Sequence, residues 1–335
     1  MGHPGVKRVR ILGGGWYGCS IGLGLAEAGY EVEVHETRKS IFEGASGSIP
    51  ARVHLGFHYP RSRMTRAACL EHSEQFMARY GHLTSGVPVN IYAIAENHSL
   101  VDFDQYVRTL SGEVQFVQIT DPAEFGLRGV EGALLTGERH IVTRRAREHF
   151  ETGLGDRIKT GVEPPEVLDD GRWDLTVDCT FCANENAGVD RYEPCIVPIL
   201  RGPVDRAITI MDGPFPSLYP WDEERGLCSL SSARWTPFSK ELRSWRAAVD
   251  LIERLTPEER LDRCEAMIAS MADFYPAIRD FELVDWKLSV RAMPLSGADT
   301  RLVDVRQLGD RLLRVRAGKI DAVLHAEKIV RGFLE

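Results

Sequence analysis

The stretch VRILGGGWYGCSIGLGLAEAGYEVEVHE, residues 9–36, decides the fold of this chain. Its apolar residues form a tight run at 9–12 and then recur at helical spacing after a glycine turn. Gly29 is placed to end that helix, and a second strand is expected at 31–35. The order of strand, glycine turn, helix and strand predicts the start of a parallel sheet built from βαβ units.

Three glycines in this turn have the spacing G-x-G-x-x-G: Gly13, Gly15 and Gly18. The first permits the tight turn, the second lets a diphosphate lie on the backbone, and the third lets helix and strand pack closely. The helix N-terminus adds N–H donors and the positive end of its dipole. Glu36 follows about twenty residues later, where a carboxylate can accept both hydroxyls of a ribose. The pattern predicts a dinucleotide site, because a glycine-rich packing seam would explain neither the turn nor the acid.

Composition excludes several classes of partner. The 335 residues are 43% hydrophobic and 27% charged, and the net charge is −8. An acidic chain is a poor match for nucleic acid or an anionic membrane, both of which require a basic face. No apolar run approaches the roughly 18 residues of a membrane span, and the N-terminus lacks the apolar segment of a secretory signal. We therefore expect a cytoplasmic protein with no nucleic-acid or membrane partner.

The seven cysteines, an odd number spread along the chain, indicate reduced thiols. Cys179 and Cys182 form a single CxxC without a second ligand pair at the spacing of a zinc site. We expect this pair to end a buried strand and expect no metal site.

Further along the chain, α/β segments at both ends and in the middle are separated by mainly β segments. We expect helices near 65–80, 103–110 and 257–274, the last preceded by a capping box at Thr256, and a final helix from Asp321. The pattern predicts an α/β fold (α+β overall), with a Rossmann-type dinucleotide-binding domain interwoven with a mainly antiparallel β-sheet substrate domain. The first domain is assigned residues 1–84, 138–188 and 286–335, and the second 85–137 and 189–285.

Four segments together resemble the FAD-dependent oxidoreductases of the D-amino-acid oxidase and glycine oxidase superfamily. They are ILGGGWYGCSIGLGLAEAGYEVEVHETR at 11–38, GASGSIPARVHLGFHYPRS at 44–62, WDLTVDCT at 173–180 and RVRAGKIDAVLHAEKIV at 314–330. The resemblance implies that the cofactor is FAD and that the Rossmann-type domain is an FAD-binding domain. A nicotinamide enzyme would not be expected to need the last three segments.

The resemblance also implies which residues hold FAD. Glu36 would bind the adenosine ribose, Arg38 would lie near the adenine or the phosphates, and the final helix would point its N-terminus at the flavin. The full expected set is Gly13, Gly15, Trp16, Tyr17, Gly18, Glu36, Thr37, Arg38, Ala45, Ser46, Gly47, Arg52, Val53, Cys179, Thr180, Gly318, Lys319 and Ile320.

Four residues are candidates for the chemistry: His54, His58, Tyr59 and Arg291. A histidine near its reference pKa could accept a substrate proton, or it could form a covalent bond to the flavin. Tyr59 could equally be a packing residue. Arg291 could bind a substrate carboxylate as a bidentate fork, or form an ordinary ion pair.

The leading functional prediction is an FAD-dependent oxidoreductase that oxidises a C–N bond of a small amine or amino-acid-like substrate by hydride transfer to flavin N5. Oxygen or another acceptor would reoxidise the flavin. One alternative is a flavoenzyme acting on a sugar or sugar nucleotide, by oxidation or in the manner of a mutase. The other is a nicotinamide-dependent dehydrogenase. The oligomeric state is left open.

Overall fold

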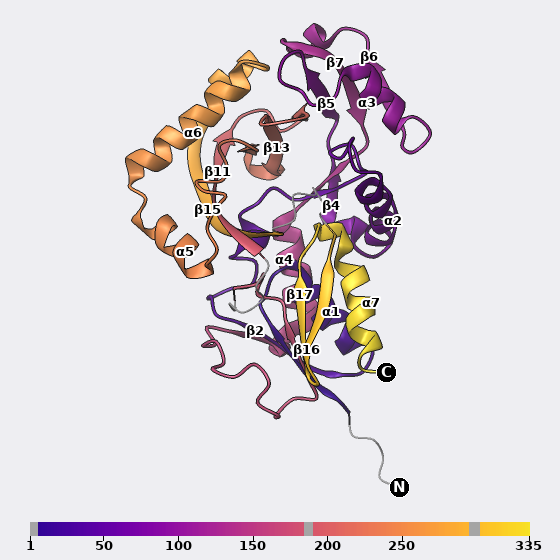
Figure 1. Ribbon diagram of the computed structural model, residues 1–335, viewed down its shortest axis with the longest axis vertical. Coiled ribbons are helices and arrows are strands. Elements are labelled where there is room, and N and C mark those ends of the chain that lie inside the picture. The colour runs from indigo at the N-terminus through magenta and orange to yellow at the C-terminus, as the bar shows by residue number, and fades with distance from the viewer. Residues whose placement is uncertain (1–5, 184–189, 295–301) are drawn as a thin grey trace.

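The computed structural model describes residues 6–183, 190–294 and 302–335, and these are arranged around two large sheets (Figure 1). In each sheet, strands that are distant in the sequence lie side by side. The chain therefore passes between the two sheets several times before it ends.

The first sheet has six strands in the order β16-β17-β10-β1-β2-β9, and all its pairs are parallel except β16–β17. Its strands are β1 (Arg8–Leu12), β2 (Glu31–Glu36), β9 (Ile158–Thr160), β10 (Leu175–Asp178), β16 (Asp304–Gly309) and β17 (Leu312–Arg316). β10 and β17 come from the middle and the end of the chain and run parallel to β1. The carboxyl ends of these three distant strands therefore lie at the same side of the sheet.

Helices pack against this sheet around one aromatic core. They are α1 (Trp16–Glu27), α2 (Arg63–Tyr80), α4 (Thr143–Leu154) and α7 (Val323–Gly332), and α1 contacts both α4 and α7. Trp16 is fully buried at the start of α1, and its ring lies 5.4–5.9 Å from those of Phe42, Phe76, Tyr80 and Phe150. Such a cluster contributes both buried area and edge-to-face contacts, and it fixes the start of α1 below the glycine turn.

The second sheet has eight strands in the order β15-β11-β14-β13-β12-β5-β7-β6, and it is antiparallel except for the β12–β5 pair. Its strands are β5 (Val89–Ala95), β6 (Phe116–Ile119), β7 (Val130–Thr136), β11 (Asp190–Arg201), β12 (Arg206–Met211), β13 (Pro216–Asp222), β14 (Leu227–Ser232) and β15 (Glu282–Pro294). The helices α5 (Trp245–Arg254) and α6 (Pro257–Ala272) pack on this sheet, and α3 (Phe103–Leu110) packs on β7.

A small third sheet joins the two parts. It pairs β3 (Arg52–Val53) and β4 (Thr84–Gly86) with β8 (Arg139–Ile141). Short 3-10 turns complete the chain at Ala45–Gly47, Gly81–Leu83, Pro122–Phe125, Gly155–Arg157, Glu223–Arg225, Pro276–Asp280 and Ile320–Ala322.

The predicted fold class is confirmed, and the differences from prediction are local. The chain leaves the small sheet after β4 and enters the eight-stranded sheet at β5, and Pro88 between them has no N–H to donate to a ladder. Strand β7 was not predicted, since Gly132 interrupts its apolar alternation. The predicted domain boundary at 286 falls inside β15, so the division into domains stays a prediction. Among the residues that the structure describes, no helix is both long and apolar enough to cross a bilayer.

Candidate cofactor and active site

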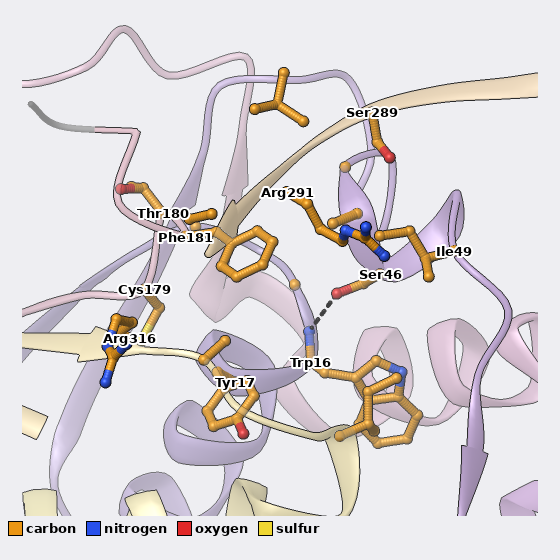
Figure 2. A pocket seen from close by; sticks show the side chains of 18 of the residues that line it. Trp16, Tyr17, Ser46, Ile49, Cys179, Thr180, Phe181, Ser289, Arg291 and Arg316 are labelled. Carbon is orange, nitrogen blue, oxygen red and sulfur yellow. Dashed lines mark hydrogen bonds between the residues drawn. The ribbon is translucent and has the colours of Figure 1, made fainter. Parts of the chain in front are cut away.

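A cavity of about 970 Å³ opens where the parallel sheet meets the antiparallel sheet (Figure 2). The glycine turn, the end of β2, the loop before β3, the turn after β10 and the segment after β17 each supply part of its wall. The far wall is strand β15, which carries Ser289 and Arg291. These six segments, from the beginning, the middle and the end of the chain, share one site.

The glycine turn is shaped by close backbone contacts. Gly13 has a φ of +101°, and a Cβ atom there would lie 2.7 Å from the carbonyl oxygen of Cys179. A Cβ on Gly18 would lie 1.9 Å from the carbonyl oxygen of Gly13, so this glycine allows the helix to pack against the turn. Gly15 begins α1 and lines the cavity, and its missing Cβ would point toward Ser46 Oγ at 2.9 Å. Gly13 and Gly18 thus allow the close backbone approaches that the motif requires, and the diphosphate contact at Gly15 stays a prediction.

The first helix turns its free N-terminus toward the cavity. The N–H of Trp16 donates to Ser46 Oγ at 3.0 Å, shown as the dashed line in Figure 2. The loop that carries Ser46 is held down by the N–H of Phe42, which donates to the carbonyl of Gly14 at 2.9 Å. N–H groups at a helix N-terminus favour an anion, and a diphosphate fits this position.

Glu36 lies at the end of β2, at the rim of the glycine turn. Its Oε2 accepts a hydrogen bond from the N–H of Gly14 at 2.8 Å, and its Oε1 accepts one from the N–H of Arg38 at 2.9 Å. The carboxylate is therefore fixed in the cavity wall, as ribose recognition requires. The guanidinium of Arg38 donates to the carbonyl of Glu43, beside the same opening.

The end of the chain is tied to its beginning through Tyr17. The Tyr17 hydroxyl donates to the carbonyl of Lys319 at 2.5 Å and accepts from the N–H of Gly318 at 3.1 Å. Burial raises the pKa of this phenol well above its ordinary value, so it remains a neutral donor. The turn before α7 therefore closes one side of the cavity.

The wall formed by Cys179 and Thr180 is supported from below by a buried ion pair. Arg314 Nε donates to Asp178 Oδ2 at 2.9 Å, and both side chains are almost fully buried. Asp178 Oδ1 accepts from both the N–H and the hydroxyl of Thr180, at 3.0 and 2.6 Å. Phe181 then takes a φ of +60°, rare for a large side chain, and its ring projects into the cavity (Figure 2).

Most of the predicted residues line the cavity. Of the expected cofactor set, the lining includes Gly13, Gly15, Trp16, Tyr17, Glu36, Thr37, Arg38, Ala45, Ser46, Arg52, Cys179, Thr180, Gly318, Lys319 and Ile320. Gly18, Gly47 and Val53 contribute to packing behind the wall. Arg52 reaches into the antiparallel sheet, where it donates to Tyr92, Thr209 and Ser217 at 3.0–3.1 Å.

The four predicted catalytic residues are brought together in the same cavity. His54, His58 and Tyr59 have ring centroids 5.5–6.1 Å apart, and Arg291 faces the cavity from β15. Burial, followed by the charges of Lys319 and Arg52, holds the pKa of His58 well below its ordinary value, so this imidazole is neutral at pH 7. Its Nδ1 is buried and has no hydrogen-bond partner among the described residues.

Arg291 lies opposite Glu193 in the register of β11 and β15. Its Nη2 donates to Glu193 Oε2 at 2.6 Å, while Arg191 Nε donates to Glu193 Oε1 at 3.1 Å. The Nε of Arg291 is buried with no hydrogen-bond partner within the described ranges. The ion pair anticipated for Arg291 therefore exists, and it leaves one buried donor unmatched.

Two buried carboxylates in this region were not predicted. Glu138 accepts from the N–H of Leu55 at 2.8 Å and from the hydroxyl of Tyr92 at 2.6 Å. Asp321 accepts from the N–H of His54 at 3.0 Å. Glu138 belongs to no motif, and Asp321 lies within the segment 314–330 but was not assigned a role; the signal available was that each is an acid within a few residues of an apolar segment.

Asp321 is expected to make the stability of the apoprotein depend on pH. Burial raises its carboxyl pKa to about 7, against about 4 in an unfolded chain. Its contribution to the free energy of unfolding is complete below pH 4 and is lost as the pH rises through 7. Asp321→Asn should flatten the pH dependence of urea unfolding between pH 5 and pH 7.

Asp310→Asn, in the exposed turn between β16 and β17, is the control and should leave that slope unchanged. An Asp321→Asn slope equal to that of the parent protein would contradict a raised carboxyl pKa.

The donor set of the cavity wall fits FAD. A glycine turn with a helix N-terminus suits a diphosphate, a fixed carboxylate suits a ribose, and the cavity continues past Lys319 to Arg291. In the part of the chain that the structure describes, no group of three or more His, Cys, Asp or Glu side chains could hold a metal ion.

Comparison with known proteins identifies relatives along the whole chain. No protein-family model matches the sequence. The chain is 30% identical over 339 residues to the FAD-dependent monooxygenase FPY4 of Fusarium mangiferae, a match that covers 97% of this chain and 90% of that protein. It is also 35% identical over 153 residues to the FAD-dependent monooxygenase kojA of Aspergillus flavus, over 44% of this chain and 36% of that protein.

Solved structures share the fold at low sequence identity. Glycine oxidase from Geobacillus kaustophilus superposes with a TM-score of 0.68 at 15% identity, over 98% of this chain and 95% of that one. Fructosamine oxidase (Amadoriase II) from Aspergillus fumigatus superposes with a TM-score of 0.72 at 14% identity, over 98% and 86%. The chain therefore belongs to the family of FAD-dependent oxidoreductases that includes FPY4 and has the fold of glycine oxidase, and its cofactor is FAD.

Proposed function

We propose that this oxidoreductase acts on the C–N bond of a small amine that carries a carboxylate, as an amino acid does. The observation that carries the proposal is Arg291, a cation in the cavity wall whose side chain is 25% exposed. A substrate carboxylate would pair with this charge through charge-assisted hydrogen bonds.

The geometry of β15 suits Arg291 to this role. Glu193, itself buried, holds one side of the guanidinium, so its orientation is set before a substrate arrives. Ser289, two residues earlier on the strand, faces the same cavity and adds a hydroxyl. A preorganised guanidinium beside a hydroxyl is well matched to a carboxylate.

His58 supplies the second part of the proposal. FAD, when bound, accepts a hydride from a substrate carbon and passes electrons on to an acceptor. Such a transfer requires the substrate nitrogen to be neutral and aligned. An imidazole that stays neutral at pH 7 can accept a hydrogen bond from that nitrogen or take up its proton.

His58→Ala is expected to lower kcat by about 10²-fold or more, the range for loss of a general base, while FAD stays bound. The measurement is steady-state turnover together with the flavin content of the purified variant. His72→Ala is the control, because His72 is also a partly buried histidine but lies on α2, outside the cavity wall. Full activity in His58→Ala would remove this residue from the mechanism.

A second candidate function is oxygenation of the same substrate class. It is favoured by the 30% identity to FPY4, which is named a monooxygenase. Binding of the substrate would use the same residues in both cases. Incorporation of labelled oxygen into the product would indicate oxygenation, whereas its absence, with hydrogen peroxide or another reduced acceptor formed, would indicate oxidation alone.

The experiment that tests the proposal is anaerobic reduction of the bound FAD by a panel of amines, with and without carboxylates, and by a sugar nucleotide. Reduction by carboxylated amines is expected, and Arg291→Met should raise the required concentration roughly 10- to 100-fold. Arg191→Met is the matched control, since Arg191 shares Glu193 but lies outside the cavity wall. Reduction by the sugar nucleotide alone would contradict the proposal.

A further inference from the structure

Glu138 is a buried carboxylate whose two oxygens have different surroundings. It immediately precedes β8 and is 2% exposed. Oε2 accepts from the Tyr92 hydroxyl, which in turn accepts from Arg52 at 3.1 Å. Oε1 accepts from the N–H of Leu55 and lies 3.7 Å from Nδ1 of His54. The tyrosine thus holds one oxygen in place and leaves the other turned toward the histidine ring.

His54 connects this carboxylate to the cavity. Its Nε2 lies 3.2 Å from Nζ of Lys319, and its backbone N–H is held by Asp321 at 3.0 Å. A lysine ammonium can only donate, so Nε2 accepts and the ring proton lies on Nδ1, the side that faces Glu138. A carboxylate next to Nδ1 favours that tautomer.

Lys319 lies in the cavity wall between this histidine and an aromatic ring. Its Nζ is 4.9 Å from the ring centroid of Tyr59, within the distance for a cation–π contact. Both neighbours favour the ammonium form, one as an acceptor and one through its π face. Glu138, His54 and Lys319 therefore form one connected row that ends in the cavity wall.

We propose that Glu138 is a positioning residue that acts through His54 to hold Lys319 as a charged ammonium in the wall of the FAD cavity. With Glu138 neutral, no carboxylate charge at Oε1 favours the tautomer that carries its proton on Nδ1, and a proton on Nε2 would oppose the ammonium. Lys319 would then turn away or lose its proton. A fixed positive charge in the wall stabilises negative charge that develops on a cofactor or on an anion bound beside it. This role does not depend on which substrate the enzyme oxidises.

The test uses sulfite, an anion that adds reversibly to protein-bound oxidised FAD, with the holoenzyme at one fixed pH. Lys319→Met is expected to raise the sulfite Kd at least about tenfold, because a unit charge several ångströms from an anion is worth that much at the effective dielectric of a protein. Glu138→Gln should raise it by a similar factor. The double variant should bind sulfite no more weakly than Lys319→Met alone, since both changes act on the one positive charge of Lys319.

The matched control is Glu223→Gln. Glu223 Oε1 lies 3.6 Å from His140 Nδ1, a carboxylate–histidine pair of the same kind, and neither residue lines the cavity. This variant should bind sulfite like the parent. Should Glu138→Gln fail to fold, His54→Asn interrupts the same connection and carries the same expectation.

Two results would overturn the inference: a parental sulfite Kd in Glu138→Gln, or a double variant in which the two effects multiply. If the Glu138 carboxylate only supported the fold, one of these two results would be observed. Failure of the proposed amine oxidation would be recognised separately, because sulfite would still bind normally to an enzyme that no carboxylated amine reduces.

Discussion

A Gly15→Val variant is expected to fold and to purify without FAD. Gly15 has a φ of −89°, an ordinary value for any residue, so valine introduces no strain in the backbone. Its side chain would instead occupy the space in front of the helix N-terminus, where a Cβ already lies 2.9 Å from Ser46 Oγ. Exclusion of the diphosphate forfeits several charge-assisted hydrogen bonds, so FAD affinity should fall at least about 100-fold. The ratio of flavin to protein absorbance measures the FAD content of the purified variant, and titration of the apoprotein with FAD measures the affinity.

The control is Gly332→Val at the end of α7, where nothing lies within 4 Å of the added Cβ. That variant should keep its FAD. A Gly15→Val protein with full flavin content would show that the diphosphate does not lie on the glycine turn.

Arg314→Met is expected to destabilise the protein by about 3–5 kcal/mol, the cost of leaving a buried charge without its partner. Asp178 would be that charge, since it is fully buried and its other oxygen already accepts from Thr180. Without the guanidinium, Asp178 is no longer held in position, and the Cys179–Thr180 part of the cavity wall loses its support. Urea unfolding of the apoprotein measures the change, and FAD affinity should fall as well.

Arg306→Met is the comparison on the neighbouring strand β16. Arg306 pairs with Asp304 at 2.5 Å, but its side chain is half exposed, and exposed pairs contribute about 0–1 kcal/mol. Equal losses in the two variants would mean that the Asp178–Arg314 pair does not support the cavity wall.

Local features of the cofactor site could be predicted because their physical cause lies in adjacent residues. The glycine turn needs particular residues at 13, 15 and 18, and the acid at Glu36 follows from the length of one helix and one strand. The comparisons with FAD-dependent relatives then exclude the nicotinamide alternative. The catalytic candidates in the loop at 54–59 also lie together in the structure, because they are neighbours in the chain.

The residues that were missed depend on contacts between distant segments. Glu138 reaches His54 only because β8 pairs with β3, and Asp321 reaches the same residue from the end of the chain. Arg52 lines the cavity, as expected, and its guanidinium also extends into the antiparallel sheet toward Thr209 and Ser217. A two-residue strand leaves no periodic signal in a sequence that would identify its pairing partner. The contacts of the two acids with His54 and the direction of the Arg52 side chain therefore could not be derived.

The measurement that most directly tests the FAD cradle is amide hydrogen exchange of the apoprotein with and without added FAD. We expect FAD to protect three separate segments together: the glycine turn at 13–17, the loop at 45–47 and the turn at 318–320. Strand β6 and helix α3, which lie outside the cavity wall, should be unaffected. Protection of the glycine turn without any change at 318–320 would contradict a cradle that the two ends of the chain build jointly.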